Sequence, residues 1–237
     1  MDKYRREFME LQLWREMLTP YELAVDELVL KFRHIIREYR NVGRYSPIEQ
    51  VDGRVKSISS ILDKMQRKKI NVNDVEKELE DIAGIRVICH YIKDIYRMSD
   101  LLLRQDDIHL LKIKDYIKNP KENGYRSLHL VVEVPVYLAN EKVMVPVEIQ
   151  IRTIAMDFWA SLEHKIRYKF EGKAPQHINE ELKACSDIVN MLDAKMLSLN
   201  EEVQALPKVG VEEHHEENVR MQKMWEENKI VDKLQKK

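Results

Sequence analysis

Apolar residues in the first part of the chain recur at spacings of three and four, the pattern of an amphipathic helix with one buried stripe. The members of this stripe are Tyr4, Phe8, Leu11, Trp14 and Leu18. The sequence at 19–22, Thr-Pro-Tyr-Glu, then has the form of a capping box, with Pro20 preset at a first helical turn. The pattern therefore predicts that a second helix starts here and runs to about Arg40.

Alternation of apolar and polar residues predicts five strands further along the chain. They are expected at residues 50–56, 85–91, 108–116, 126–136 and 143–152. Because a short polar stretch joins the last two, these are expected to form an antiparallel hairpin.

Helical spacing returns between the strands. Helices are expected at residues 57–68, 74–84 and 93–105. Gly84 would cap the second of them, because glycine tolerates the left-handed conformation that often ends a helix.

From Thr153 onward the pattern is helical, with breaks at 172–175 and 207–210. The mixture of strands and helices predicts an α+β fold. Residues 1–204 are expected to form one domain with helical ends, and residues 205–237 a charged tail that is helical or flexible.

Charge and composition narrow the function classes. The 237 residues include 40 basic and 41 acidic ones, so no overall field draws the chain onto nucleic acid or an anionic membrane, and any phosphate affinity must be local. No segment approaches the roughly 18–20 apolar residues that span a bilayer, and no signal core is found at the N-terminus. The only cysteines, Cys89 and Cys185, suggest neither a disulfide framework nor a thiolate metal cluster. A cytoplasmic protein is expected.

Three of the predicted strands place a polar row opposite an apolar row. In the last strand Glu148, Gln150 and Arg152 share the face opposite its valines and isoleucines. The same alternation groups Tyr125, Ser127 and His129, and groups Arg86 and His90. A sheet exposed to water would give this pattern too, but carboxylate, guanidinium, imidazole and phenol groups on one face favour a concave site.

Two carboxylates in this part of the chain suit Mg²⁺, which prefers a few carboxylates together with phosphate oxygens. Asp81 lies at a helix-to-strand junction and Glu148 within a strand. Taken singly, each has the ordinary alternative of a surface acid or an ion-pair partner.

Basic residues in the same part of the chain suit a polyphosphate, because arginine gives bidentate and lysine point-charge contacts. The set is Arg54, Lys56, Lys64, Lys121 and Arg126. The alternative for such residues is a solvated helical face, which we prefer for residues 67–69. The sequence contains no HExxH or CxxC metal motif and no GxxxxGK[ST] or GxGxxG nucleotide loop. The residues alone therefore indicate a Mg²⁺-dependent site for nucleoside polyphosphates.

Five ordered motifs carry a resemblance to a known family. They are GRVKSISSILDK (53–64), DIAGIRVI (81–88), NGYRSLH (123–129), VEIQIRT (147–153) and WASLEHKIRYK (159–169). Together, in this order and spacing, they resemble the synthetase domain of the RelA/SpoT family, over about residues 20–200. Because neither a hydrolase domain nor a C-terminal regulatory region accompanies them, the chain is similar to the small alarmone synthetases of the stringent response.

The resemblance implies a mixed sheet of about five strands flanked by helices, akin to nucleotidyltransferases. It also implies a transferase, a Mg²⁺-dependent pyrophosphokinase that moves the β,γ-pyrophosphate of ATP to the 3′-hydroxyl of GDP or GTP, giving AMP and ppGpp or pppGpp. By position in the motifs, the ATP site would comprise Arg54, Lys56, Ser60, Lys64 and Arg86. The GDP or GTP site would comprise Lys121, Tyr125, His129, Gln150 and Arg152. Asp81 and Glu148 would be catalytic and hold Mg²⁺, while the general base stays open between these two and water.

Assembly and control also follow from the resemblance. Small synthetases of this type form homotetramers, and intramolecular packing is the alternative use of the apolar helical ends. Some relatives are activated by alarmone through an aromatic residue where this chain has Gln50, a departure that argues against such control here. Two other functions stay open: a silent binding module for guanine nucleotides or single-stranded RNA, and an enzyme that transfers a nucleotidyl group and releases pyrophosphate. The preferred acceptor among GDP, GTP and GMP is open as well.

Overall fold

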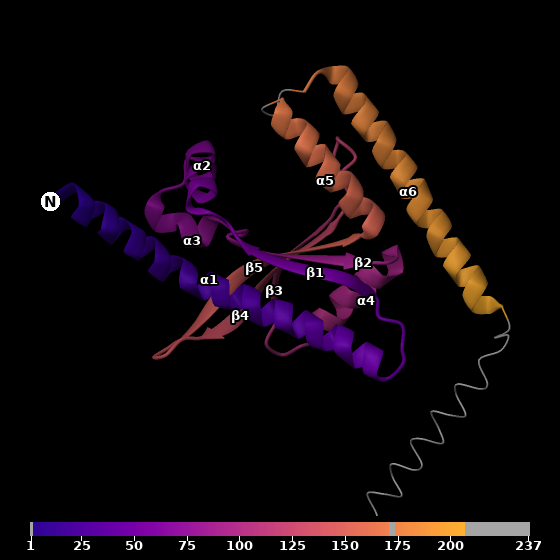
Figure 1. Cartoon of the computed structure of the whole chain (residues 1–237), viewed down its shortest axis with the longest axis horizontal. Coiled ribbons are helices and arrows are strands. Elements are labelled where there is room, and N and C mark those ends of the chain that lie inside the picture. Colours follow the sequence, from indigo (N-terminus) through magenta and orange to yellow (C-terminus); the bar gives the residue numbers. More distant parts are fainter. Residues whose placement is uncertain (1, 171–173, 207–237) are drawn as a thin grey trace, which may run out of the picture. The chain divides into compact units, whose positions relative to one another are not determined.

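A five-stranded mixed sheet forms the centre of the computed structural model, which describes residues 2–170 and 174–206 (Figure 1). The strands follow the order β1-β2-β5-β4-β3 across the sheet. β2 and β5 are parallel, and the other neighbouring pairs are antiparallel. The strands are β1 (Ile48–Val55), β2 (Ala83–Cys89), β3 (His109–Asp115), β4 (Leu128–Tyr137) and β5 (Lys142–Thr153). The α+β fold with a mixed sheet is confirmed, and so is the final hairpin.

Helices flank the sheet. They are α1 (Asp2–Asn41), α2 (Ile58–Lys68), the short 3-10 helix η1 (Val72–Asp74), α3 (Val75–Glu78), α4 (Ile92–Leu103), α5 (Ile154–Lys169) and α6 (Gln176–Ala205). Residues as far as Leu197 belong to one compact unit, and the last turns of α6 belong to a second. The fold and the site below concern the first unit. Beyond its first two residues, the predicted charged tail at 205–237 lies outside the described residues. No helix in the described ranges is long and apolar enough to cross a membrane.

The predicted break between two N-terminal helices is wrong, because α1 runs without interruption through Pro20. The Thr19 hydroxyl donates a hydrogen bond of 2.8 Å to the carbonyl of Arg15, one turn back, instead of capping a new helix. The buried stripe of α1 continues on both sides of the proline, from Leu18 to Phe32. Packing of that stripe against the sheet therefore keeps the helix continuous despite the hydrogen bond that proline cannot donate.

The helix predicted at 74–84 is also much shorter, since α3 covers only Val75–Glu78. Leu79 and Ile82 are fully buried in the core, and β2 begins directly afterwards at Ala83. Gly84 is therefore a strand residue and not a helix cap. Burial of these apolar residues in the sheet outweighs the helical pattern of this short segment.

One face of the sheet is closed by α1 and α4, whose buried side chains form the main core with the apolar rows of β2, β4 and β5. Gly53 lets α1 approach β1 closely, because a Cβ atom at this position would lie 2.5 Å from a methyl group of Val25. The opposite face carries the polar rows. In Figure 1, α2 and α3 lie toward one end of that face and α5 toward the other.

Candidate active site

A polar row crosses the whole sheet on the face opposite α1. The register pairs Asp52 with Arg86, Arg86 with Gln150, Gln150 with His129, and His129 with Lys114, one residue from each strand. Because register partners on one face are neighbours, these side chains stand side by side. The row forms the floor of the candidate site.

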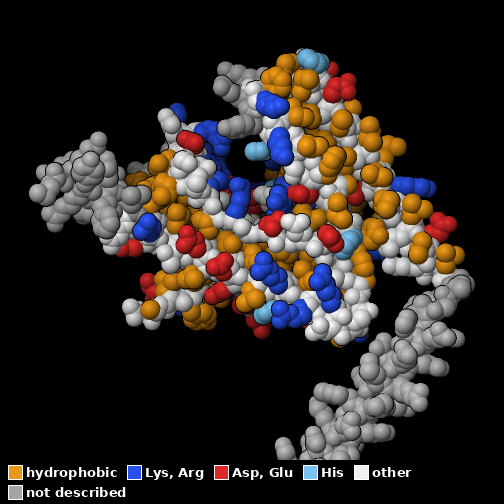
Figure 2. Space-filling model, viewed as in Figure 1, with side chains coloured by type: hydrophobic (Ala, Val, Ile, Leu, Met, Phe, Trp, Pro, Cys, Tyr) orange, Lys and Arg blue, Asp and Glu red, His pale blue; other side chains and the backbone are white. Residues whose placement is uncertain are grey.

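Two adjoining cavities lie over this floor, of about 560 Å³ and about 880 Å³, sizes that suit nucleotide-sized ligands. Their shared lining is Asp81, Tyr125, Glu148, Gln150 and Glu163. Figure 2 shows a hollow ringed by lysine and arginine side chains on this side of the molecule. The first cavity also contains Arg54, Arg86 and Arg152, and the second Lys114, Lys121 and His129.

Asp81 is held by two lysines that both contact the same carboxylate oxygen. Its Oδ2 lies 2.7 Å from Nζ of Lys56 and 2.6 Å from Nζ of Lys64. Burial alone would raise the pKa of this carboxyl, but the two lysines reverse the effect and lower it, so Asp81 is ionised at neutral pH. Its other oxygen, Oδ1, is buried and has no hydrogen-bond partner among the described residues.

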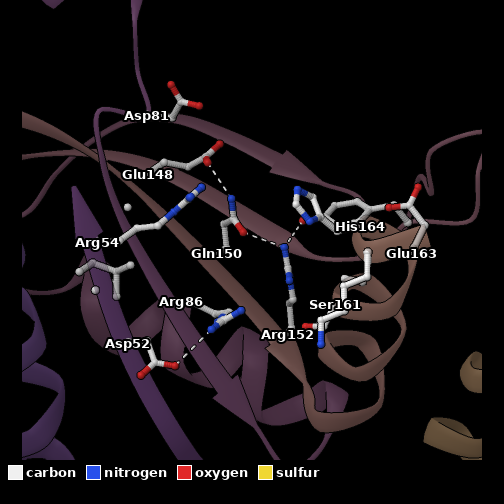
Figure 3. A pocket seen from close by; sticks show the side chains of 16 residues that line it. Asp52, Arg54, Asp81, Arg86, Glu148, Gln150, Arg152, Ser161, Glu163 and His164 are labelled. Atoms are coloured by element: carbon white, nitrogen blue, oxygen red, sulfur yellow. Dashed lines mark hydrogen bonds and ion pairs between the residues drawn. The ribbon is translucent and has the colours of Figure 1, made fainter. Parts of the chain in front are cut away.

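Glu148 is the second acid of the site. Its Oε1 lies 3.1 Å from Nδ1 of His129, and its Oε2 accepts a 2.8 Å hydrogen bond from the amide of Gln150. Burial and the negative charge of Asp81 both raise the pKa of Glu148. The contacts with His129 and Gln150 outweigh these effects and lower the pKa to about 2. Figure 3 shows the two acids next to each other at one end of the first cavity, where Arg54 reaches toward Glu148.

A buried oxygen without a partner is costly unless something binds it. Asp81 Oδ1 has no such partner among the described residues, and Asp81 and Glu148 both line the first cavity. No group of three or more metal-ligating side chains occurs within 2–170 and 174–206. Two carboxylates with an open side fit a Mg²⁺ ion that takes its remaining ligands from phosphate and water.

The two arginines near β1 have different surroundings. Arg54 lies over Gly84, where a Cβ atom would make an ordinary van der Waals contact of 3.9 Å with Cγ of Arg54. Arg86 contacts Asp52 at 3.3 Å and Asp157 of α5 at 3.6 Å. Two acids therefore fix its guanidinium at the cavity wall, and Figure 3 shows the contact with Asp52.

Two cations lie close to the ring of Tyr125. The Lys121 ammonium is 4.8 Å from the ring centroid and the Arg152 guanidinium is 5.1 Å from it, both within the cation–π range. The Tyr125 hydroxyl lies 2.8 Å from Nε2 of His129. Lys121 also lies over the ring of Tyr116. Burial raises the pKa of Tyr125, so the phenol stays protonated.

Arg152 connects the acids to the tyrosine. Its Nη2 donates hydrogen bonds to Gln150 Oε1 at 2.7 Å and to the Tyr125 hydroxyl at 2.6 Å, and its Nη1 donates to Asp157 at 3.1 Å. Through Gln150 the network reaches Glu148. Nearly buried and with its donors paired, Arg152 is a rigid part of the wall.

Eleven of the twelve predicted site residues lie at the cavities or contact Asp81, and Ser60 does not. Its hydroxyl lies 2.8 Å from that of Ser57 in the first turn of α2, and the described lining of both cavities lacks it. The basic residue Arg126 turns away, with a guanidinium nitrogen 3.7 Å from Asp187 of α6. His90, grouped with Arg86 on one strand face, lies just after the end of β2 and pairs with a glutamate of β1.

Several lining residues were not singled out from the sequence. Asn123 donates a 2.9 Å hydrogen bond to Glu163, a nearly buried acid of α5 that also pairs with Arg167. Asp157 of α5, which the described lining of the two cavities does not include, joins Arg86 to Arg152. Asn123 and Glu163 lie inside two of the five sequence motifs, and membership of a motif could have identified them as site residues.

Comparison with known proteins places these features in context. A family model described as a region found in RelA/SpoT proteins matches residues 53–173. The GTP pyrophosphokinase YwaC of Bacillus subtilis is 47% identical over 192 residues, which cover 80% of this chain and 91% of YwaC. Among solved structures, small alarmone synthetase 1 from Bacillus subtilis bound to its product pppGpp superposes with a TM-score of 0.78 at 41% identity, covering 81% of this chain and 99% of that one. A structure of small alarmone synthetase 1 from Bacillus subtilis bound to AMPCPP superposes with a TM-score of 0.72 at 36% identity. The match covers 82% of this chain and 100% of that one.

Proposed function

This chain belongs to the RelA/SpoT family, and we propose that it is a GTP pyrophosphokinase that transfers the β,γ-pyrophosphate of ATP to the 3′-hydroxyl of GDP or GTP. The products are AMP and ppGpp or pppGpp. One observation carries the proposal: two ionised carboxylates, Asp81 and Glu148, line the same cavity beside cations that suit a polyphosphate. The names and ligands of the similar proteins support it.

Asp81 and Glu148 would hold a divalent metal ion, which we propose is Mg²⁺. Asp81 Oδ1 supports this assignment, because no described residue forms a hydrogen bond with it. When bound, Mg²⁺ would neutralise charge on the phosphate oxygens. Both side chains must be deprotonated to bind it, and the lowered pKa values of both carboxyls meet that requirement.

The ATP half of the site would lie toward β1 and α2. Arg54 and Arg86 are proposed to clasp the adenine, because guanidinium planes stack on aromatic rings. Lys56 and Lys64, which lie together on Asp81, would supply positive charge to the phosphates. Ser60 is proposed as a further phosphate contact on family grounds, and its place outside the cavity lining makes it the weakest member of the set.

The acceptor half would lie toward β4 and the turn before it. Tyr125 is proposed to stack on guanine, with Lys121 and His129 near the acceptor phosphates. Gln150 and Arg152 would act as supports, since they hold Glu148 and Tyr125 by hydrogen bonds. Phosphoryl transfer depends mainly on positioning and charge neutralisation, so a pre-formed wall of this kind is what the reaction needs.

We also propose the oligomeric state, the cellular compartment and the domain limits of the enzyme. A homotetramer is supported by exposed apolar residues at helical spacing on α6, Ile188, Met191, Leu192 and Met196. The free cysteines Cys89 and Cys185 agree with a reducing cytoplasm. Residues 1–204 are proposed as the synthetase domain and the remainder as an appended tail.

A product assay tests the function directly. Purified protein is incubated with ATP, Mg²⁺ and, in separate reactions, GDP, GTP or GMP, and the nucleotides are separated by chromatography. We expect one AMP to form for each molecule of alarmone, which is ppGpp from GDP, pppGpp from GTP and pGpp from GMP. Release of pyrophosphate in place of AMP would indicate nucleotidyl transfer, and tight binding of single-stranded RNA without AMP release would indicate a silent binding module. Either result would contradict the proposal.

A further inference from the structure

Helix α6 begins at Gln176, after the last residue that the family model matches. Its first half nevertheless packs against the acceptor side of the site. Leu182 is buried together with Trp159 of α5, and Tyr125 packs against that cluster. The Trp159 indole donates a 2.9 Å hydrogen bond to the carbonyl of Leu182.

The tightest contact joins Ser186 of α6 to the turn that precedes Tyr125. The buried Ser186 hydroxyl donates a hydrogen bond of 2.5 Å to the carbonyl of Gly124. A Cβ atom on Gly124 would lie 2.6 Å from Cβ of Ser186, so only glycine fits between the helix and the turn. Gly124 also has a φ of +89°, which residues with a side chain rarely adopt.

This turn determines the positions of Lys121 and Tyr125, two residues proposed to bind the acceptor nucleotide. Its backbone is closed by hydrogen bonds from Gly124 N to Lys121 O and from Lys121 N to Tyr125 O. On one side Asn123 ties it to Glu163 of α5. On the other side Ser186 of α6 holds it, although the described lining of both cavities does not include Ser186.

Resting on the proposed function, we infer that Ser186 is a positioning residue for the acceptor nucleotide. By holding the carbonyl of Gly124, it fixes the turn that directs Lys121 and Tyr125 into the cavity. The acceptor half of the site is then completed by the first half of α6, which lies after the matched family region. Loss of the Ser186 hydroxyl should weaken binding of the acceptor nucleotide and leave binding of ATP unaffected.

The test is Ser186→Ala, which removes one oxygen atom and leaves the packing of Cβ in place. Initial rates are measured with GDP and with GTP at saturating ATP, and with ATP varied at saturating acceptor. We expect the KM for the acceptor to rise about three- to tenfold, the range of one lost hydrogen bond, and the KM for ATP to stay within about twofold. Cys185→Ala is the matched control, because it removes one atom from the exposed neighbouring residue; neither constant should change.

A Michaelis constant does not depend on how much of the protein is active, so partial unfolding of the variant cannot imitate the expected result. Hydrogen exchange of the amides at residues 121–126 should also accelerate in Ser186→Ala. If alanine prevents folding, Ser186→Cys keeps a weak donor and should give a smaller rise in the same constant.

An unchanged acceptor KM, or equal rises for acceptor and ATP, would overturn the inference even if the melting temperature falls. The wild-type reaction separates this failure from failure of the proposed function. If the wild type forms no AMP, the function is wrong; if it forms AMP and Ser186→Ala keeps its acceptor KM, only the role of Ser186 is wrong.

Discussion

The carboxylate of Asp81 contacts two lysines through one oxygen, and its other oxygen is buried with no hydrogen-bond partner in the part of the chain that the structure describes. A metal ligand must keep a free electron pair, and this arrangement provides one. Asp81→Asn keeps the shape of the side chain but removes its charge. We expect kcat/KM for alarmone synthesis to fall at least about 100-fold, as for other electrostatic groups at a reacting centre.

The same assay with varied Mg²⁺ provides a second readout, since the Asn variant should need more Mg²⁺ for half-maximal rate. Asp63→Asn is the control, an equal change at an exposed acid of α2, and it should keep wild-type activity. If Asp81→Asn kept its activity within about twofold, the proposed metal site would be lost.

Glu148 also contributes to the pH dependence of stability. Folding lowers the pKa of its carboxyl from the usual 4.5 to about 2, so the folded state favours the ionised form. This contribution is fully present above pH 4.5 and is lost as the pH falls toward 2. Its size is on the order of 3 kcal/mol.

Urea unfolding of the wild type and of Glu148→Gln checks this. We expect the wild type to have the higher free energy of unfolding at pH 6, and the difference to shrink steadily when the measurement is repeated at pH 4 and pH 3. A difference that stays constant over this range, or grows as the pH falls, would contradict the lowered pKa.

At the level of residues, the sequence could predict the groups inside contiguous motifs, because strand alternation assigns them to one face. Glu148, Gln150 and Arg152 are found this way, and the register places them on one side of β5. Asp157 could not be found in the same manner. Its importance comes from contacts with Arg86 and Arg152 of two different strands, which no local pattern contains.

The contact between α1 and β1 is the clearest test of packing between elements. A Cβ atom at Gly53 would lie 2.5 Å and 2.8 Å from methyl groups of Val25 and Val29. Gly53→Ala should therefore overpack the core and lower the free energy of unfolding by about 1–3 kcal/mol. Gly84→Ala is the matched control in the adjacent strand, where the nearest atoms would lie at 3.9 Å.

Urea denaturation of both variants provides the measurement. We expect a lower midpoint for Gly53→Ala at an unchanged m-value and a midpoint near that of the wild type for Gly84→Ala. Equal losses in the two variants would show that the cost belongs to glycine in a strand and not to the close approach of α1.

Long elements with a strong period were predictable from sequence to within a few residues at each end, as β5 and α4 illustrate. Two errors have the same origin. The proline signal at position 20 and the helical spacing at 74–84 are local preferences, and in both places burial of apolar residues in the core prevailed. Local propensity cannot indicate how deeply a residue will be buried.

On the scale of the whole chain, the sequence alone could not determine the order of the strands. β5 lies between β2 and β4, and it pairs in parallel with β2 although β3 and β4 separate them in sequence. This order brings Asp81, two residues before β2, beside Glu148 of β5. The site is therefore a product of topology, and the motifs mark its residues without giving their arrangement.

Assembly is the last property that belongs to this scale. The outer side of α6 exposes Ile188 and Met191, each more than 60% accessible, with Leu192 beside them, and Figure 2 shows hydrophobic side chains along this helix. Such a stripe is costly in water and suits a second copy of the chain. We expect sedimentation equilibrium to find four chains in the wild type, and fewer in the double variant Ile188→Lys, Met191→Lys.

The control for this experiment is Lys195→Glu, which changes charge at another exposed position of α6 and should leave the assembly intact. Because the proposed site is built within one chain, the lysine variant should keep measurable synthesis of alarmone when its assembly is reduced. A wild type that sediments as a monomer at micromolar concentrations would contradict the tetramer and leave the chemistry of Asp81 and Glu148 as it stands. Loss of both assembly and synthesis in the lysine variant would instead mean that the site depends on contacts between chains.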